Sequence, residues 1–214
     1  TINGLGEGDP INALKSTGNK VQLGSVKNTS QNIYVVMDAG INFSPSLGIP
    51  VHGIIGYDLF RDFVVDVNYV KKTIKFYDQE QYRYRSTKNT RVVDMTVIRK
   101  KAYLDAFVMI NKTEEIPVKM LLDTGSSDAV WLFEDERIQL PKKHYQDFLG
   151  KGLAGDIFGK RTKIDHIKIS DFVLSDAKAA FPDMETFNTI ADFGGRNGSL
   201  GGEVIKRFNV AFDY

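Results

Sequence analysis

Cysteine is absent from the 214-residue sequence, which excludes disulfides and thiolate metal sites. No apolar run approaches the length of a membrane span. The net charge is only +1, and the charges are well mixed, so there is no electrostatic argument for nucleic acid or another polyanion as a partner. The remaining composition, 42% hydrophobic and 26% charged, is that of an ordinary globular protein with room for one large domain or two small ones.

The sequence contains an internal repeat. "GIIGYDLFRDFVVDVNY" spans residues 53–69, "GSLGGEVIKRFNVAFDY" spans residues 198–214, and the two align without a gap at an offset of 145. In each copy an apolar strand ends at a glycine, a short amphipathic helix follows, and a strand with alternating apolar residues closes the unit. We interpret this as a duplicated lobe. The identical pairs are Gly53/Gly198, Gly56/Gly201, Phe63/Phe208, Val65/Val210 and Tyr69/Tyr214.

The periodicity predicts a mostly β protein, in which short strands are separated by Gly, Asn or charged turns. Short helices are expected at 57–62, 134–138, 142–149 and 202–207. The stretch 78–90 is polar and lacks periodicity, which predicts a linker between lobes. This organisation gives a first lobe over 1–77 and a second over 91–214.

The segment "LLDTGSSDAVWLF", residues 121–133, places Asp123 between an apolar strand and a turn of small polar residues. One interpretation is an Asp that caps its own turn; the other is a catalytic carboxylate. The repeat offset puts the counterpart of Asp123 before Thr1, and nothing in residues 1–90 replaces it. Because "TINGLGEGDP" looks like a loop rather than a natural start, we expect a fragment that lacks the front half of the first lobe, and the missing signal peptide then carries no information.

The "DTGSS" string, together with the "GxxG" elements "GIIG" and "GSLG" at a fixed period, resembles the aspartic proteases, both the two-lobed pepsin-like branch and the retropepsin-like enzymes. The resemblance implies an all-β acid-protease fold of two related barrel-like lobes and an aspartic endopeptidase activity. By this resemblance Asp123 is catalytic, and Thr124, Gly125 and Ser126 support the catalytic loop. Thr124 would bond across to the other lobe, Gly125 would offer an unhindered N–H, and Ser126 would donate to an Asp123 oxygen.

The resemblance also implies that an apolar strand threads beneath each catalytic loop, formed by Ile54, Ile55 and Gly56 in one copy and by Leu200 and Gly201 in the other. Ser199 departs from this pattern, because a hydroxyl stands where the first copy has Ile54. The Gly-rich pieces 3–10 and 150–159 fall where the family has a hairpin flap over the substrate.

The implied chemistry needs two carboxylates and one water, so no cofactor or metal is expected. The expected partner is a peptide or protein substrate, and the fragment alone is expected to be inactive until its own missing amino-terminal segment completes it. Two alternatives stay open: a catalytically inactive peptide-binding module of the same fold, and a single-lobe homodimer that uses two copies of Asp123. Family habit favours an exported microbial protein.

Overall fold

A computed structural model describes residues 2, 11–37, 41–183 and 195–214, and the description below refers to these residues. Strands dominate, and each helix is a single turn of four residues. The predicted all-β fold is therefore confirmed. Among the described residues, no helix is long and apolar enough to cross a bilayer.

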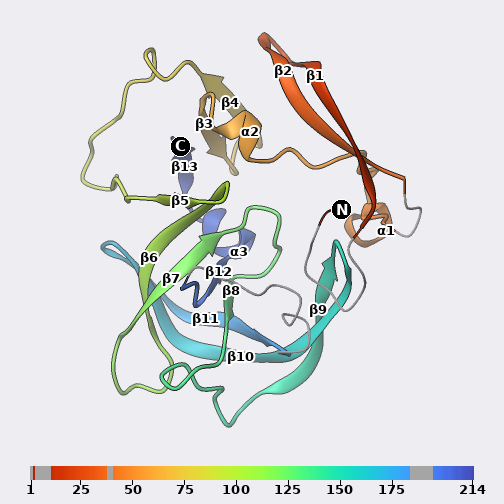
Figure 1. The fold of residues 1–214 in the computed structure, drawn as a ribbon. Helices are drawn as coiled ribbons and strands as arrows, with labels where there is room; N and C mark the ends of the chain where they lie inside the picture. Colours follow the sequence, from red (N-terminus) through yellow and green to blue (C-terminus); the bar gives the residue numbers. More distant parts are fainter. Residues whose placement is uncertain (1, 3–10, 38–40, 184–194) are drawn as a thin grey trace.

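A barrel forms the larger part of the protein (Figure 1). Its sheet has the strand order β5-β6-β7-β12-β8-β11-β10-β9, and a further pairing of β6 with β10 closes it. Alternate side chains of the strands point inward, so the core is filled by residues such as Val108, Met120, Leu132, Ile164 and Phe181. The strands are β5 (Thr96–Ile98), β6 (Lys101–Met109), β7 (Ile116–Leu122), β8 (Val130–Leu132), β9 (Tyr145–Gly152), β10 (Gly155–Ile169), β11 (Phe172–Pro182) and β12 (Gly198–Leu200).

The two copies of the repeat have matching secondary structure. Helix α2 (Tyr57–Phe60) in the first copy and α3 (Gly202–Ile205) in the second begin and end 145 positions apart. Each helix follows a glycine in extended conformation, Gly56 or Gly201, which is its N-cap. The repeat seen in the sequence is therefore a repeat of structure.

The closing strands of the two copies pair with each other. β13 (Asn209–Phe212) lies antiparallel to β3 (Val64–Asn68), and β4 (Thr73–Tyr77) completes a three-stranded sheet. Asp66 faces Ala211, its own counterpart at the offset of 145, while Val65 faces Phe212 and Val67 faces Val210. This register is that of a local two-fold axis through the pair Asp66/Ala211.

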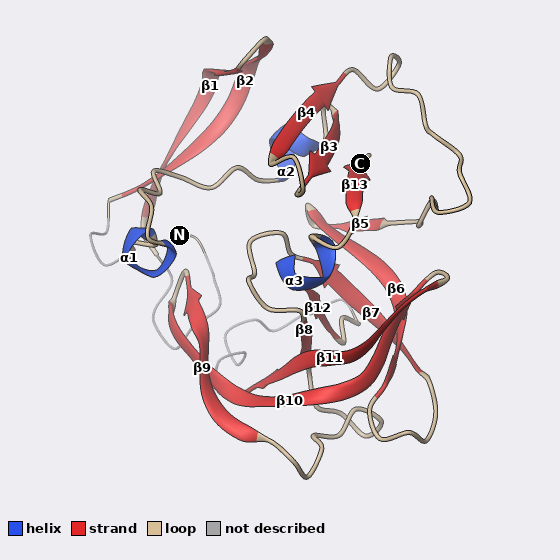
Figure 2. Ribbon diagram, turned by 180° about the vertical axis from the view of Figure 1, so that it is seen from behind, coloured by secondary structure: helices blue, strands red, loops and turns tan. Residues whose placement is uncertain are grey.

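A long hairpin of β1 (Ala13–Leu23) and β2 (Val26–Val36) stands apart from the barrel in both views (Figures 1 and 2). Helix α1 (Ser44–Leu47) follows it in the chain. The hairpin and the residue after it expose several large apolar side chains: Leu14, Ile33, Tyr34, Val35 and Met37.

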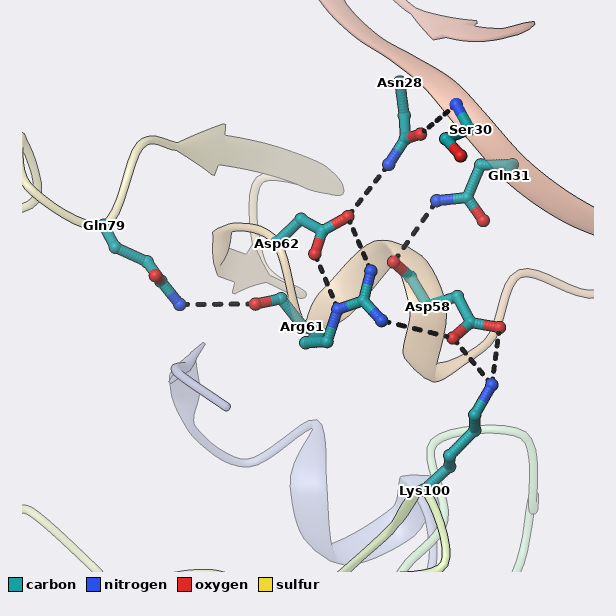
Figure 3. A network of polar contacts seen from close by, with 8 residues as sticks. All are labelled: Asn28, Ser30, Gln31, Asp58, Arg61, Asp62, Gln79 and Lys100. Carbon is teal, nitrogen blue, oxygen red and sulfur yellow. Dashed lines mark hydrogen bonds and ion pairs between the residues drawn. The ribbon is translucent and has the colours of Figure 1, made fainter. Parts of the chain in front are cut away.

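Polar contacts join this hairpin to α2 and α2 to the barrel (Figure 3). Asn28 Nδ2 donates to Asp62 Oδ2 at 2.9 Å, and Gln31 Nε2 donates to the Asp58 carbonyl at 3.2 Å. On the other side of α2, Lys100 Nζ from the β5–β6 turn donates to Asp58 Oδ1 at 2.8 Å. Asp58 therefore links the amino-terminal part of the chain to the barrel.

Two predicted helices are wrong. Residues 142–149 do not form a helix, because Tyr145–Gly152 is strand β9, which pairs along β10. Residues 134–138 form an irregular turn in which Asp135 Oδ1 accepts the N–H groups of Arg137 and Ile138, each at 2.7 Å. In the first case long-range pairing overrides local preference, and in the second a side chain replaces helical hydrogen bonds.

Candidate active site

Asp123 lies at the point where β7 leaves the barrel and the loop 123–129 begins. Its N–H donates to the Leu200 carbonyl of β12 at 2.9 Å, and its Oδ1 accepts the Gly125 N–H at 3.0 Å. The residue is half-buried. Its neighbour Leu122 packs both against the barrel core and against the apolar cluster beneath β3 and β13. Asp123 thus lies at the boundary between the barrel and the sheet that joins the two repeats.

The loop rests on the strand that the resemblance placed beneath it. β12 lies between β7 and β8, parallel to the first and antiparallel to the second. The Gly201 N–H donates to Ala129 O at 2.9 Å, and the Gly202 N–H donates to Ser126 O at 2.7 Å. A Cβ on Gly201 would stand 2.2 Å from the Asp128 carbonyl oxygen, so only glycine fits this close approach.

The remaining predicted loop residues have different surroundings. Thr124 and Gly125 are exposed, and a Cβ on Gly125 would stand 3.4 Å from Asp123 Oδ1, an ordinary contact. Gly125 therefore contributes to the position of the Asp123 carboxylate through its N–H, which donates to Asp123 Oδ1. Ser126 Oγ accepts the Asp128 N–H at 3.3 Å. The donation from Ser126 to Asp123 that the sequence suggested stays a prediction.

The charge of Asp123 acts on a lysine. The β6–β7 ladder ends at the pair Tyr103/Leu121, and Lys101 lies two residues before Tyr103 on β6, as Asp123 lies two residues after Leu121. Burial lowers the pKa of Lys101, the positive charges of Arg196 and Arg99 lower it further, and the charge of Asp123 acts in the opposite direction. Cationic groups therefore gather on this side of Asp123.

Arg196 is only 8% exposed, and it explains why Ser199 departs from the repeat. Its Nε donates to the Gly198 carbonyl at 2.8 Å, and its Nη2 donates to the buried Ser199 Oγ. Its guanidinium stacks over the Phe133 ring at 5.1 Å. Burial lowers the pKa of Arg196 to about 10, against the opposing influence of Tyr103 and Asp123. An isoleucine at position 199 would leave this buried cation without its hydroxyl acceptor.

The loop 123–129 also contains a second polar group. Asp128 accepts two hydrogen bonds, one from the Trp131 indole Nε1 at 2.6 Å and one from Arg161 Nη1 at 2.5 Å. Arg161 Nε also donates to Asp147 Oδ2 at 2.5 Å. Asp147 and Arg161 lie on β9 and β10, so this group joins the loop to a hairpin.

That β9–β10 hairpin contains the second of the two Gly-rich pieces, residues 150–159. Its tip is at Gly152–Gly155, and Gly150 and Gly155 have φ angles of 141° and 128°, which favour glycine. The first Gly-rich piece, residues 3–10, lies outside the described residues.

The first copy of the repeat lacks such surroundings. Ile54 and Ile55 are 72% and 55% exposed, and no atom lies within 4 Å of a Cβ placed on Gly56. In the described residues 51–56 there is no strand. In the second copy the Asp123 loop is therefore seated on its strand, whereas the equivalent segment of the first copy, residues 54–56, forms no strand.

The sequence analysis missed Lys101, Arg161 and Arg196. Lys101 could have been found, because the antiparallel register of the strands around residues 101–123 follows from the turn between them. Arg161 carries no local signal, because its partner Asp128 lies 33 residues away in the sequence. Arg196 precedes its partner Ser199 by only three residues, and the departure of Ser199 from the repeat is a local signal that could have pointed to it. Among the described residues, no group of three His, Cys, Asp or Glu side chains could hold a metal ion.

Residues 107–204 match the family model described as aspartyl protease. The match is just under half of the chain and runs from β6 to α3, so it includes Asp123, its loop and the strand beneath it. No curated protein sequence matches the chain. The family match supports an aspartyl protease family for this part of the chain, and with it a hydrolase of the protease type.

Proposed function

We propose that the protein is an aspartic endopeptidase in which Asp123 is one of two catalytic carboxylates. The observation that carries this proposal is the seating of the Asp123 loop on the "SLGG" strand, within a segment that matches the aspartyl protease family. Asp123 is half-buried and held from both sides, by its own N–H and by the Gly125 N–H. A catalytic carboxylate needs a position that is fixed in this way by its neighbours.

The chemistry follows from placing two carboxylates beside one water. Two such charges in contact cannot both ionise cheaply, so the pair shares one proton. One carboxylate then accepts a proton from the water as it attacks the peptide carbonyl, and the other donates a proton to the carbonyl oxygen. The roles reverse when the amine leaves. Asp123 supplies one carboxylate of the pair, and the Gly125 N–H holds it in place.

The second carboxylate, in this proposal, belongs to sequence upstream of Thr1. The exposed side chains of Ile54 and Ile55 support this, because their counterparts in the second copy are covered by β7, β8 and the Asp123 loop. An upstream segment of the same kind would cover the first copy in the same way. The lobes would then be residues 1–77, with the upstream segment, and residues 91–214, joined by the linker 78–90.

The pairing of β3 with β13 favours this arrangement over a homodimer of single lobes. The two repeats already meet across a local two-fold axis within one chain. A second copy of the chain would need the same strands for a symmetric contact of this kind. A peptide substrate would lie extended between the lobes, beneath the β9–β10 hairpin.

The test is peptide hydrolysis by the chain expressed with its native upstream sequence. Asp123→Asn and Asp123→Ala are expected to lower kcat by on the order of 10³-fold or more. Asp171→Asn, which changes an exposed carboxylate in the β10–β11 turn, serves as the matched control and is expected to leave turnover unchanged. Unchanged turnover in both Asp123 variants would overturn the proposal. Peptide binding without hydrolysis, with no Asp-Thr/Ser-Gly upstream, would instead indicate the inactive binding module.

A further inference from the structure

The side chain of Asp128 connects three parts of the barrel. It directly follows the Asp-Thr-Gly-Ser-Ser sequence, and its carboxylate accepts from the Trp131 indole and the Arg161 guanidinium. Arg161 in turn binds Asp147, on the other strand of the hairpin. One continuous path of hydrogen bonds therefore runs from the catalytic loop through Arg161 to both strands of the β9–β10 hairpin.

The hydrogen bonds of this path are less exposed to water near the loop, at Asp128, than near β9, at Asp147. The side chains of Arg161 and Asp128 are 20% and 14% exposed, whereas that of Asp147 is 39% exposed. Burial alone would lower the pKa of Arg161, but its hydrogen bonds and charge interactions with Asp128 and Asp147 raise it. The Asp128–Arg161 pair is thus less exposed than the Arg161–Asp147 pair. Removing one partner of the Asp128–Arg161 pair would leave an unpaired charge in a partly buried position, which destabilises the fold.

The path holds the hairpin at its base. Arg161 pairs with Tyr145 at the start of β9, while the tip lies at Gly152–Gly155. Between the two, the strand register shifts at Ile157/Phe158, which marks a bulge. Gly150 lies beside this bulge with a φ of 141°. The hairpin therefore has an anchored base, a break in its ladder and a tip beyond the break.

We propose that Asp128 and Arg161 are positioning residues that lock the base of the β9–β10 hairpin to the catalytic loop, so that only the part beyond Gly150 is free to move over the substrate. This inference rests on the proposed function, in which the β9–β10 hairpin covers the bound peptide. The physical link itself stands on the contacts of the described residues.

Trp131 offers a direct readout of this link. It is the only tryptophan of the sequence, it is buried, and its indole N–H donates to the same carboxylate that Arg161 binds. Its fluorescence therefore responds to changes at Asp128. Hydrogen exchange of the hairpin amides gives a second readout that does not depend on activity.

Asp128→Asn and Asp147→Asn form a matched pair, because each removes one negative charge from one side of Arg161 without a change of shape. We expect Asp128→Asn to shift the Trp131 emission and to speed exchange in 145–161 and in the loop 124–129 by roughly tenfold. Asp147→Asn is expected to leave the emission and the loop exchange unchanged. In Arg161→Met, the further change Asp128→Asn should then add little to the exchange in 145–161, since the link is already broken.

With the upstream sequence present, Asp128→Asn is expected to raise KM for a peptide more than it lowers kcat. Asp147→Asn leaves the Asp128–Arg161 pair intact and is expected to raise KM by less. Equal fluorescence and exchange in the two Asn variants would overturn the proposed link. If Arg161→Met fails to fold, this pair still decides the question. An absence of peptidase activity in the unmodified protein would count against the proposed function alone, because fluorescence and exchange would still report on the link.

Discussion

Ile55 and Leu200 occupy the same position in the two copies of the repeat, but 55% of Ile55 is exposed and only 1% of Leu200. The helices that follow them have the same length and the same glycine N-cap, and their closing strands pair with each other. The difference therefore does not come from the repeat itself. It comes from β7, β8 and the Asp123 loop, which cover the second copy. The helix and the closing strand form in both copies, whereas burial of the apolar segment before them depends on whether other strands cover it.

The largest expected effect is at the glycine beneath the loop. In Gly201→Ala the new Cβ would collide with backbone, so we expect a loss of more than about 4 kcal/mol in the free energy of unfolding. Gly56→Ala, its counterpart, meets no atom within 4 Å, and we expect a loss below about 1 kcal/mol, mainly the N-cap preference. Urea unfolding of the 214-residue chain measures both.

The comparison becomes sharper with the native upstream sequence in place. If that sequence covers the first copy, Gly56→Ala should then destabilise the protein nearly as much as Gly201→Ala. A Gly56→Ala effect that stays small in the longer chain would contradict the proposed completion of the first lobe.

A smaller effect is expected for the apolar side chain before each glycine. Leu200→Ala removes a fully buried side chain from the barrel core and should cost about 3 kcal/mol. Ile55→Ala should cost less than about 1 kcal/mol in the 214-residue chain, because the side chain remains in contact with water. Equal losses for the two variants in this chain would show that the first copy is covered by residues of its own.

The smallest effect concerns the helix ion pairs, Glu203–Lys206 in α3 and Asp58–Arg61 in α2, which occupy equivalent positions. The hydrogen bond from Lys206 lowers the pKa of Glu203. A lowered carboxylate pKa stabilises the folded state above the unfolded pKa, and this gain is lost as the pH falls through the folded pKa. Both side chains are exposed, so Glu203→Gln should cost less than about 1 kcal/mol at pH 7 and nothing well below the folded pKa of Glu203.

Thermal unfolding of Glu203→Gln across pH tests this sign. The control is Asp58→Asn, which also removes the acceptor of Lys100 and so loosens the contact between α2 and the barrel. A loss of stability in Glu203→Gln that persists in acid would show that the side chain acts by packing rather than by charge.

How far the sequence predicts this structure depends on how far apart in the sequence the interacting residues lie. The repeat located α2, α3, β3 and β13 because each is encoded within 17 adjacent residues. The motif at 123–126 located the loop for the same reason. Residues 142–149 were assigned to a helix because their pairing with β10 is invisible locally. The contact of Arg161 with Asp128 likewise depends on how the chain folds back on itself, whereas Arg196 and Ser199 are only three residues apart.

The antiparallel contact centred on Asp66 and Ala211 has a consequence for how the protein can change over time. In an assembly of identical subunits, one codon alters both sides of the symmetry axis at once. Here the two halves are separate stretches of one polypeptide, so each can accumulate its own substitutions. Isoleucine at 54 and the serine–arginine pair at 199 and 196 are such a divergence. In the proposed function the substrate is a peptide, which has a direction, so two unlike halves could bind its two ends differently.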